Sequence, residues 1–171
     1  LVYSTYIGGE KDEQGCSLTL AASGAVYLSG WTNSTLFPAT PGSFQSFYAP
    51  GVLGFVLELN AAGSALVFST FISGKPFAID ADGLGATYVA GIDPSFTFYG
   101  TPGAFDTTNS GSGDSFAMKL DATGSSLVYA TFVGGSSGAQ VLGSSVDVSG
   151  SQFVCGWTGS SDFPTTPGAW K

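Results

Sequence analysis

The chain has 171 residues, enough for one domain, and 43% of them are hydrophobic, enough to build a core. Only 9% are charged, and abundant Gly, Ser and Thr indicate a β-rich protein with many tight turns. The net charge of −8, without arginine, excludes the basic surface that nucleic acids require, and no apolar run approaches the ~18 residues of a membrane span.

The first predicted element is a strand over residues 1–9, LVYSTYIGG, and this segment recurs. Near copies are LVFSTFISG at 66–74 and LVYATFVGG at 127–135, which start 65 and 61 residues apart. Such a period indicates a repeat architecture. The single segment 1–171 then divides into repeats 1–65, 66–126 and 127–171, the last of them incomplete. Because both faces of the alternating pattern are apolar or aromatic, we expect each sheet to be covered on both sides.

Three further strands are expected after each copy of this segment. The first strands are SLTLAA from Ser17, FAIDA from Phe77 and GSSVDV from Gly143. The second strands are AVYLSGWT from Ala25, ATYVAGI from Ala86 and SQFVCGWT from Ser151. The third strands are GFVLELN from Gly54 and SFAMKLD from Ser115. A Pro-marked loop separates second from third strands, and the turns NAAG and DATG are typical of hairpins with a left-handed Gly. No third strand follows the last loop, so eleven strands are predicted.

Four short antiparallel strands per repeat, buried against neighbouring repeats, is the plan of a β-propeller blade. The predicted fold is therefore all-β, with about three four-stranded antiparallel blades in an incomplete ring; a β-solenoid is the alternative. Propellers close with ~4–8 blades, so this chain does not close a ring alone. Either it is a piece of a longer propeller, or several copies complete a ring or filament and a free sheet edge accepts a neighbour's strand.

The repeats resemble the bacterial seven-bladed β-propeller repeat, the SBBP repeat. The matching pieces are LVYSTYIGG from Leu1, VDVSGSQFVCGWT from Val146, DFPTTPGAW from Asp162 and DSFAMKLDATGSSLVYATFVGG from Asp114. The middle repeat departs most, with GIDPSFTFYGTPG from Gly91. The resemblance implies a bacterial protein that is secreted or attached to the cell surface, commonly a large one with many repeats. It implies no known activity.

Reactive groups are few. The absence of histidine excludes Ser-His-Asp and Cys-His catalysis and His-ligated metals, so no catalytic or cofactor-binding residue is predicted. In DADG, Asp80 and Asp82 are weak candidates for calcium, although the downstream Glu of such a loop is missing. Asp80 and Asp147 are predicted to occupy matching places, which favours a role in the turn. An enzyme acting on polysaccharides would need two carboxylates ~5–10 Å apart, and no local motif marks them.

Three tryptophans, Trp31, Trp157 and Trp170, are candidate ligand-binding residues, because exposed indole rings form platforms for sugars. Packing between blades is the alternative. Cys16 and Cys155 are read as two small buried residues, with a disulfide bridge or a reactive thiol as alternatives. The predicted function is a non-catalytic structural or protein-interaction scaffold whose partners are other blades of the same or neighbouring chains. Glycan binding is the second prediction.

Overall fold

A computed structural model describes residues 1–50, 52–94, 98, 100–111 and 113–170. All regular secondary structure in this part of the chain is β-strand, which confirms the predicted all-β class. The strands are β1 (Glu13–Leu20), β2 (Val26–Thr32), β3 (Val52–Leu59), β4 (Leu66–Ser73), β5 (Lys75–Ala81), β6 (Thr87–Ile92), β7 (Ser115–Leu120), β8 (Leu127–Val133), β9 (Ala139–Val146) and β10 (Gln152–Thr158). A search of the described residues found no helix long and apolar enough to cross a membrane.

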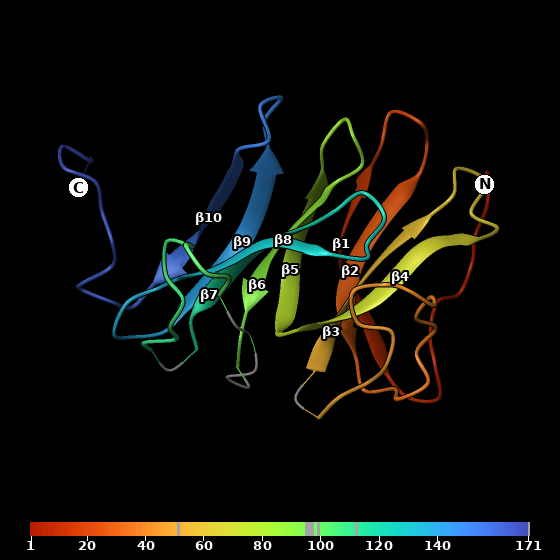
Figure 1. The fold of residues 1–171 in the computed structure, drawn as a ribbon, viewed down its shortest axis with the longest axis horizontal. Coiled ribbons are helices and arrows are strands. Elements are labelled where there is room, and N and C mark those ends of the chain that lie inside the picture. The colour runs from red at the N-terminus through yellow and green to blue at the C-terminus, as the bar shows by residue number, and fades with distance from the viewer. Residues whose placement is uncertain (51, 95–97, 99, 112, 171) are drawn as a thin grey trace.

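These strands form three antiparallel sheets that follow one another along the long axis of the molecule (Figure 1). The first sheet has the order β1-β2-β3-β4, the second β5-β6-β7-β8, and the third contains only β9 and β10. Each later copy of the opening segment is the last strand of a sheet, β4 or β8, and leads into the first strand of the next sheet. The recurring segment thus joins one sheet to the next.

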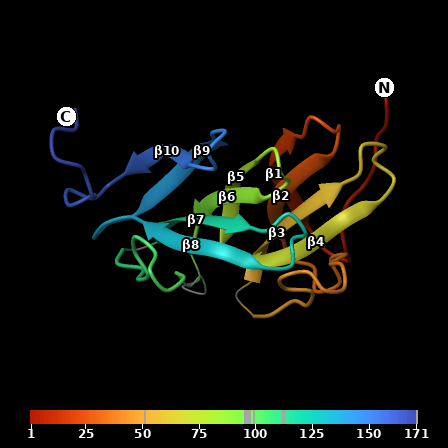
Figure 2. The same cartoon turned by 45° about the horizontal axis from the view of Figure 1, so that its top comes forward.

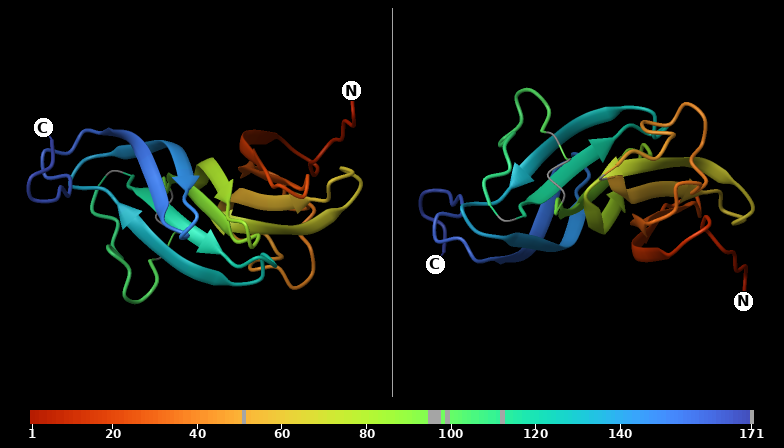
Figure 3. Two further views of the ribbon diagram at one scale, coloured as in Figure 1. Left: turned by 90° about the horizontal axis from the view of Figure 1, so that it is seen from above. Right: turned by 90° about the horizontal axis from the view of Figure 1, so that it is seen from below.

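The first strands of the three sheets, β1, β5 and β9, lie next to one another in the order of the chain (Figures 2 and 3). Each contains one extra, bulged residue at the same place, which is Cys16 in β1, Phe77 in β5 and Leu142 in β9. A bulge bends a strand locally and is a designed feature of a sheet. Its repetition shows that the three repeats share backbone detail as well as strand order.

The core between the first and second sheets is continuous and aromatic. Tyr27, Val56, Phe68 and Ile72 of the first sheet pack against Ile79, Val89, Phe116, Met118 and Leu120 of the second. A second cluster, made of Phe37, Phe55, Leu57, Leu59 and Phe71, covers the other face of the first sheet. In β4 both Phe68 and Phe71 are buried although they point to opposite faces. The prediction that this strand is covered on both sides is confirmed.

The prediction of a strand over residues 1–9 is wrong. These residues form no strand, and Leu1 and Tyr6 are fully exposed, so the described chain has ten strands instead of eleven. The physical reason is the missing hydrogen-bond partner. The later copies, β4 and β8, each pair with a third strand, β3 or β7, whereas residues 1–9 precede the first sheet and the described chain holds no third strand for them.

Residues 1–9 nevertheless lie partly where the last strand of a preceding sheet would lie. A Cβ atom built on Gly63, in the turn between β3 and β4, would lie 2.3 Å from the ring of Tyr3. The same atom on Gly124, in the turn between β7 and β8, would lie 2.2 Å from the ring of Phe68. Tyr3 and Phe68 are matching residues of the recurring segment. The segment before a sheet therefore lays one aromatic ring on a glycine of that sheet.

Candidate interaction site on the third sheet

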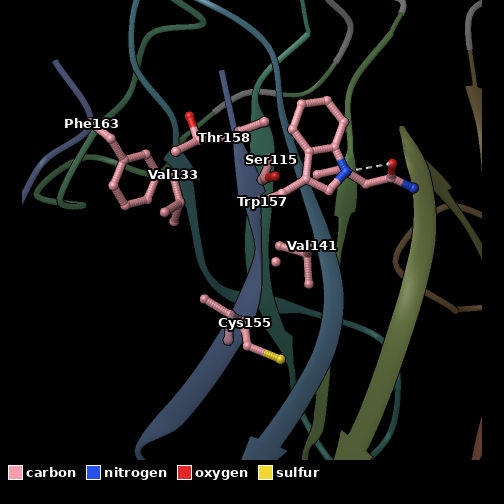
Figure 4. A pocket seen from close by; sticks show the side chains of 11 residues that line it. Ser115, Val133, Val141, Cys155, Trp157, Thr158 and Phe163 are labelled. Atoms are coloured by element: carbon pink, nitrogen blue, oxygen red, sulfur yellow. Dashed lines mark hydrogen bonds between the residues drawn. The ribbon is translucent and has the colours of Figure 1, made fainter. Parts of the chain in front are cut away.

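The candidate site is a groove beside the third sheet, which we call the β10 groove. It has a volume of about 200 Å³. Its lining residues are Ser115, Val133, Ala139, Gln140, Val141, Val154, Cys155, Gly156, Trp157, Thr158 and Phe163 (Figure 4). They come from β9 and β10, the ends of β7 and β8, and the Pro-marked loop after β10. None of them is acidic or basic, so the lining favours an apolar occupant over an ion.

Phe163 has two counterparts in the complete sheets. Phe37, the first residue of the FPATPG loop, stacks on Phe55 of β3 with 4.4 Å between ring centroids and meets Phe71 of β4 edge-on at 6.0 Å. Phe98 stacks in the same way on Phe116 of β7, at 4.5 Å. The third sheet has no third or fourth strand in the described chain, so the half-buried Phe163 lacks the corresponding rings.

The free edge of β10 forms one side of this region. The matching strands β2 and β6 are paired on both sides, whereas among the described strands β10 pairs with β9 alone. A free edge presents a row of backbone N–H and C=O groups that can bind another strand. Within the described residues the outer edge of β10 therefore has no partner strand.

The third sheet is held to the second by polar contacts as well as by the small cluster of Ala78, Ala90, Val141 and Val154. The Tyr129 hydroxyl in β8 donates to Oε1 of Gln152 in β10 at 2.7 Å. Nε2 of Gln152 donates to the Val89 carbonyl in β6 at 3.4 Å. Desolvation raises the pKa of Tyr129 to about 12, so this hydroxyl stays a donor at all physiological pH values. These contacts fix the β9–β10 hairpin against the second sheet, although the described residues form no third or fourth strand beside it.

One face of β10 is uncovered; we call Phe153, Cys155 and Trp157 the uncovered face. By strand alternation these three side chains point the same way. Tyr27 and Tyr88 match Phe153 in the first and second sheets and are 4% and 0% exposed, whereas Phe153 is 60% exposed. Each tyrosine is covered by the sheet that follows it, whereas the described residues form no sheet after the third.

The tryptophans fall into three different environments. Trp31 donates its indole N–H to Oε1 of Gln14 at 3.1 Å, and the Lys75 ammonium of the next sheet lies 5.1 Å from the ring centroid. Trp157 makes the same bond to Gln140, at 3.3 Å (Figure 4), but is 55% exposed. Trp170 is 99% exposed and does not line the groove. Trp31 therefore fits packing between sheets, and only Trp157 lies exposed beside a groove.

The two cysteines are free thiols. Cys16 is half-buried, and desolvation raises its pKa. Cys155 is exposed, which corrects the expectation that both are buried. Its counterparts Ser29 and Ala90 are fully buried between sheets, so its exposure has the same origin as that of Phe153.

Asp80 does not match Asp147, which corrects the sequence analysis. The turn residue that matches Asp147 is Asp82, because each accepts the amide of a glycine three residues later and donates its own amide to a carbonyl four residues later. Asp80 instead pairs with Tyr88 across β5 and β6, as Thr19 does with Tyr27. The error arose because Asp80 precedes Gly83 by three residues, as Asp147 precedes Gly150, whereas the turn glycine with positive φ is Gly85, three residues after Asp82.

Asp80 connects all three sheets. Its Oδ1 accepts a hydrogen bond from the Thr19 hydroxyl of β1 at 3.3 Å, and its Oδ2 accepts one from the Val146 amide of β9 at 2.8 Å. Oδ1 also accepts the amide of Ala81 at 2.9 Å. With these donors the carboxylate acts as a clamp between neighbouring first strands.

Asp82 organises the β5–β6 turn. Its Oδ1 accepts the amides of Leu84 and Ala86, both at 3.0 Å, and its Oδ2 lies 3.4 Å from the Lys119 ammonium. Burial opposes ionisation, but these bonds, with one from the Tyr88 hydroxyl, outweigh it and lower the pKa of Asp82. The oxygens of Asp82 already accept hydrogen bonds from amides and lie beside an ammonium. They are therefore poorly suited to a calcium site, which needs several free oxygen ligands.

The two fully buried carboxylates belong to the loop between β6 and β7. Asp93 accepts the Phe98 amide at 3.1 Å, and Asp114 accepts the Ser110 amide at 2.7 Å. Neither residue lines the β10 groove. Among the described residues there is also no group of three or more acidic or thiol side chains suited to a metal ion.

We expect Asp80→Ala to loosen the contact between sheets. Removal of the carboxylate leaves the Val146 amide without its charged partner, which should lower the free energy of unfolding by about 1.5–3 kcal/mol. Urea denaturation measures the loss, and hydrogen exchange should show faster exchange at Val146. Asp12→Ala, which removes the same charge from an exposed side chain, serves as the control. Equal stability of the two variants would contradict the clamp.

The lowered carboxyl pKa values predict acid sensitivity. The Ser149 hydroxyl and the Ser151 amide lower the pKa of Asp147. The pKa of Glu10 is lowered to about 2 because its carboxylate accepts hydrogen bonds, first from its own amide and then from Thr35 and Leu36. A group whose pKa is lower in the folded than in the unfolded state stabilises the fold above ~pH 4, and this contribution is lost as the pH falls through the folded value. The urea concentration at the midpoint of unfolding should therefore decrease as the pH is lowered from about 4 to about 2.

Glu58 provides an internal control for this titration. Burial raises its pKa, so its effect on stability has the opposite sign and partly offsets the acid loss. Glu58→Gln should remove the gain in the urea midpoint that this carboxyl gives as the pH falls from neutral to ~pH 4, and should leave the slope at lower pH unchanged. A midpoint that does not change with acidification in the wild-type chain would contradict the assignment.

Sequence reasoning found Trp157 but missed Gln140, Val154 and Phe163 as parts of one groove. The signal was present in the repeats, since Phe163 matches Phe37 in the shared FP-x-TPG pattern. Comparison with known proteins found no family model that matches the chain, and no curated protein matches it either.

Proposed function

We propose that the chain is a segment of a β-propeller that acts as a non-catalytic scaffold and protein-interaction module in a larger propeller or assembly. The observation that carries the proposal is the exposure of Phe153, 60%, against 4% and 0% for its counterparts Tyr27 and Tyr88. The third sheet carries the same kinds of residues as the two packed sheets, but no other sheet of the described chain covers them. Apolar surface of this kind in a soluble protein marks an interaction site.

The chemistry of the groove supports a binding role. Its lining contains no carboxylate, ammonium or imidazole and, apart from the Cys155 thiol, consists of apolar and neutral polar residues, which suits an apolar partner. The resemblance to the SBBP repeat adds the proposal that the protein is bacterial and exported, either secreted or attached to the cell envelope. Low charge and many hydrogen-bonded turns suit such a structural role.

Solution mass tests this proposal. Sedimentation velocity of the 17.3 kDa chain over a hundredfold range of concentration should show association, because the uncovered face is apolar. A double variant, Phe153→Ser with Trp157→Ser, should remain monomeric. Leu84→Ser, which alters an exposed apolar side chain in a turn, should associate like the wild type. A wild-type monomer at every concentration, or association that survives the double variant, would contradict the proposal.

Glycan binding is the second candidate, favoured by one observation: Trp157 is exposed and lines a groove. An indole platform with the Gln140 amide beside it offers an apolar face and a hydrogen-bonding edge to a sugar ring. Titration with soluble oligosaccharides should then shift the tryptophan fluorescence, and Trp157→Ala should abolish the shift. Absence of a shift in the wild type at millimolar sugar removes this candidate.

A further inference from the structure

We infer that the β10 groove is a docking site for a β-hairpin with the chemistry of β7 and β8. Such a hairpin has a first strand with a small residue, Phe and, four residues later, Leu, followed by a second strand of the LVYATFV kind. The inference rests on the proposed scaffold function and names its partner. Addition of strands to a free sheet edge is an established mode of recognition.

The register of the docked strand follows from the complete sheets. In the second sheet Ile92, Gly91 and Thr87 of β6 face Ser115, Phe116 and Leu120 of β7. The matching residues of β10 are Trp157, Gly156 and Gln152. A docked strand therefore places its small residue opposite Trp157, its Phe opposite Gly156 and its Leu opposite Gln152.

Glycine at the place of Gly156 first of all lets the first strand of the sheet approach closely. A Cβ built on Gly156 would lie 2.0 Å from the carbonyl oxygen of Gln140 in β9, and one built on its counterpart Gly30 would lie 2.2 Å from that of Gln14 in β1. In the first sheet the Cβ on Gly30 would also lie 2.6 Å from the ring of Phe55, which faces Gly30 from β3. Glycine at this place therefore serves the pairing with the first strand, and in the first sheet it also admits the ring of the third strand.

Phe163 is the second recognition element. In both complete sheets the matching phenylalanine stacks on the third-strand ring at 4.4 or 4.5 Å and meets a fourth-strand ring edge-on at 6.0 or 5.2 Å. Phe163 lines the groove next to Val133 (Figure 4). Two rings of a docked hairpin, counterparts of Phe116 and Phe132, would complete the same aromatic cluster.

Residues 1–9 of a second copy are a weaker occupant for this edge. Their sequence is that of a fourth strand, which in both complete sheets pairs with a third strand and never with a second one. They lack the small-residue–Phe–x–x–x–Leu pattern that faces β2 and β6. The strand that pairs directly with the edge of β10 should therefore be of the third-strand kind.

Calorimetric titration tests the inference with the whole chain. The probe is a synthetic hairpin with the sequence of residues 114–135, and we expect 1:1 binding. A hairpin with Phe116→Ser and Phe132→Ser, and a peptide of residues 1–9, should bind at least tenfold more weakly. Phe163→Ala in the chain should weaken binding at least tenfold. Phe105→Ala, which alters an exposed ring in the matching loop of the second sheet, should leave it unchanged.

The outcomes separate this inference from the proposed function. No binding of the hairpin, or equal binding of the serine hairpin or of residues 1–9, overturns the docking site. If the chain still associates through Phe153 and Trp157 in that case, the scaffold function stands. If neither association nor hairpin binding occurs, both are overturned.

Discussion

Gly124→Ala is expected to lower the free energy of unfolding by about 2–4 kcal/mol. Gly124 has φ of +64°, a conformation that costs an alanine about 1 kcal/mol. Its new Cβ would also lie 2.2 Å from the Phe68 ring of the neighbouring sheet, and overpacking of this kind costs about 1–3 kcal/mol more. The turn between β7 and β8 is thus a packing surface for the first sheet.

Gly42→Ala provides the matched control. Gly42 has φ of +81°, but a Cβ there would meet no atom within 4 Å. Its substitution should show the backbone strain alone, about 1 kcal/mol. Urea denaturation of both variants measures the difference. Equal losses would mean that the contact between Phe68 and Gly124 does not hold the two sheets together.

Phe37→Ala is expected to cost about 3–4 kcal/mol, whereas Phe163→Ala should cost about 1 kcal/mol or less. Both phenylalanines begin the same FP-x-TPG pattern. Phe37 is 4% exposed and packs against Phe55 and Phe71, while Phe163 has no such rings beside it in the described chain. Thermal or urea unfolding of the two variants compares a complete sheet with an incomplete one in loops that share the FP-x-TPG pattern. Similar losses would show that Phe163 is already packed, and would contradict an open third sheet.

The strands were predictable because period-2 alternation and turn residues mark them locally. All ten strands of the structure overlap predicted ones. The starts of β1, β5 and β9 lie several residues earlier than predicted, because the bulge at Cys16, Phe77 or Leu142 interrupts the alternation. Alternation does not reveal whether a strand has a partner, and for this reason residues 1–9 were mistaken for a strand.

The candidate site was predictable only in part. The count of strands indicated an unpaired edge, and Trp157 was recognised. The groove itself brings together Val133 of one repeat segment with Phe163 at the far end of the chain, a contact that depends on how the sheets pack. The place of Asp80 was also missed, since its bonds to Thr19 and Val146 span two other repeats and leave no local pattern.

The central claim is that the third sheet is an open copy of the first two. Amide hydrogen exchange, read residue by residue with and without the hairpin of residues 114–135, tests it most directly. We predict that β2 and β6 are protected along their length and that alternate amides of β10, those that face away from β9, exchange rapidly until the hairpin is added. Uniform protection of β10 in the chain alone, or no change on addition of the hairpin, would contradict the claim.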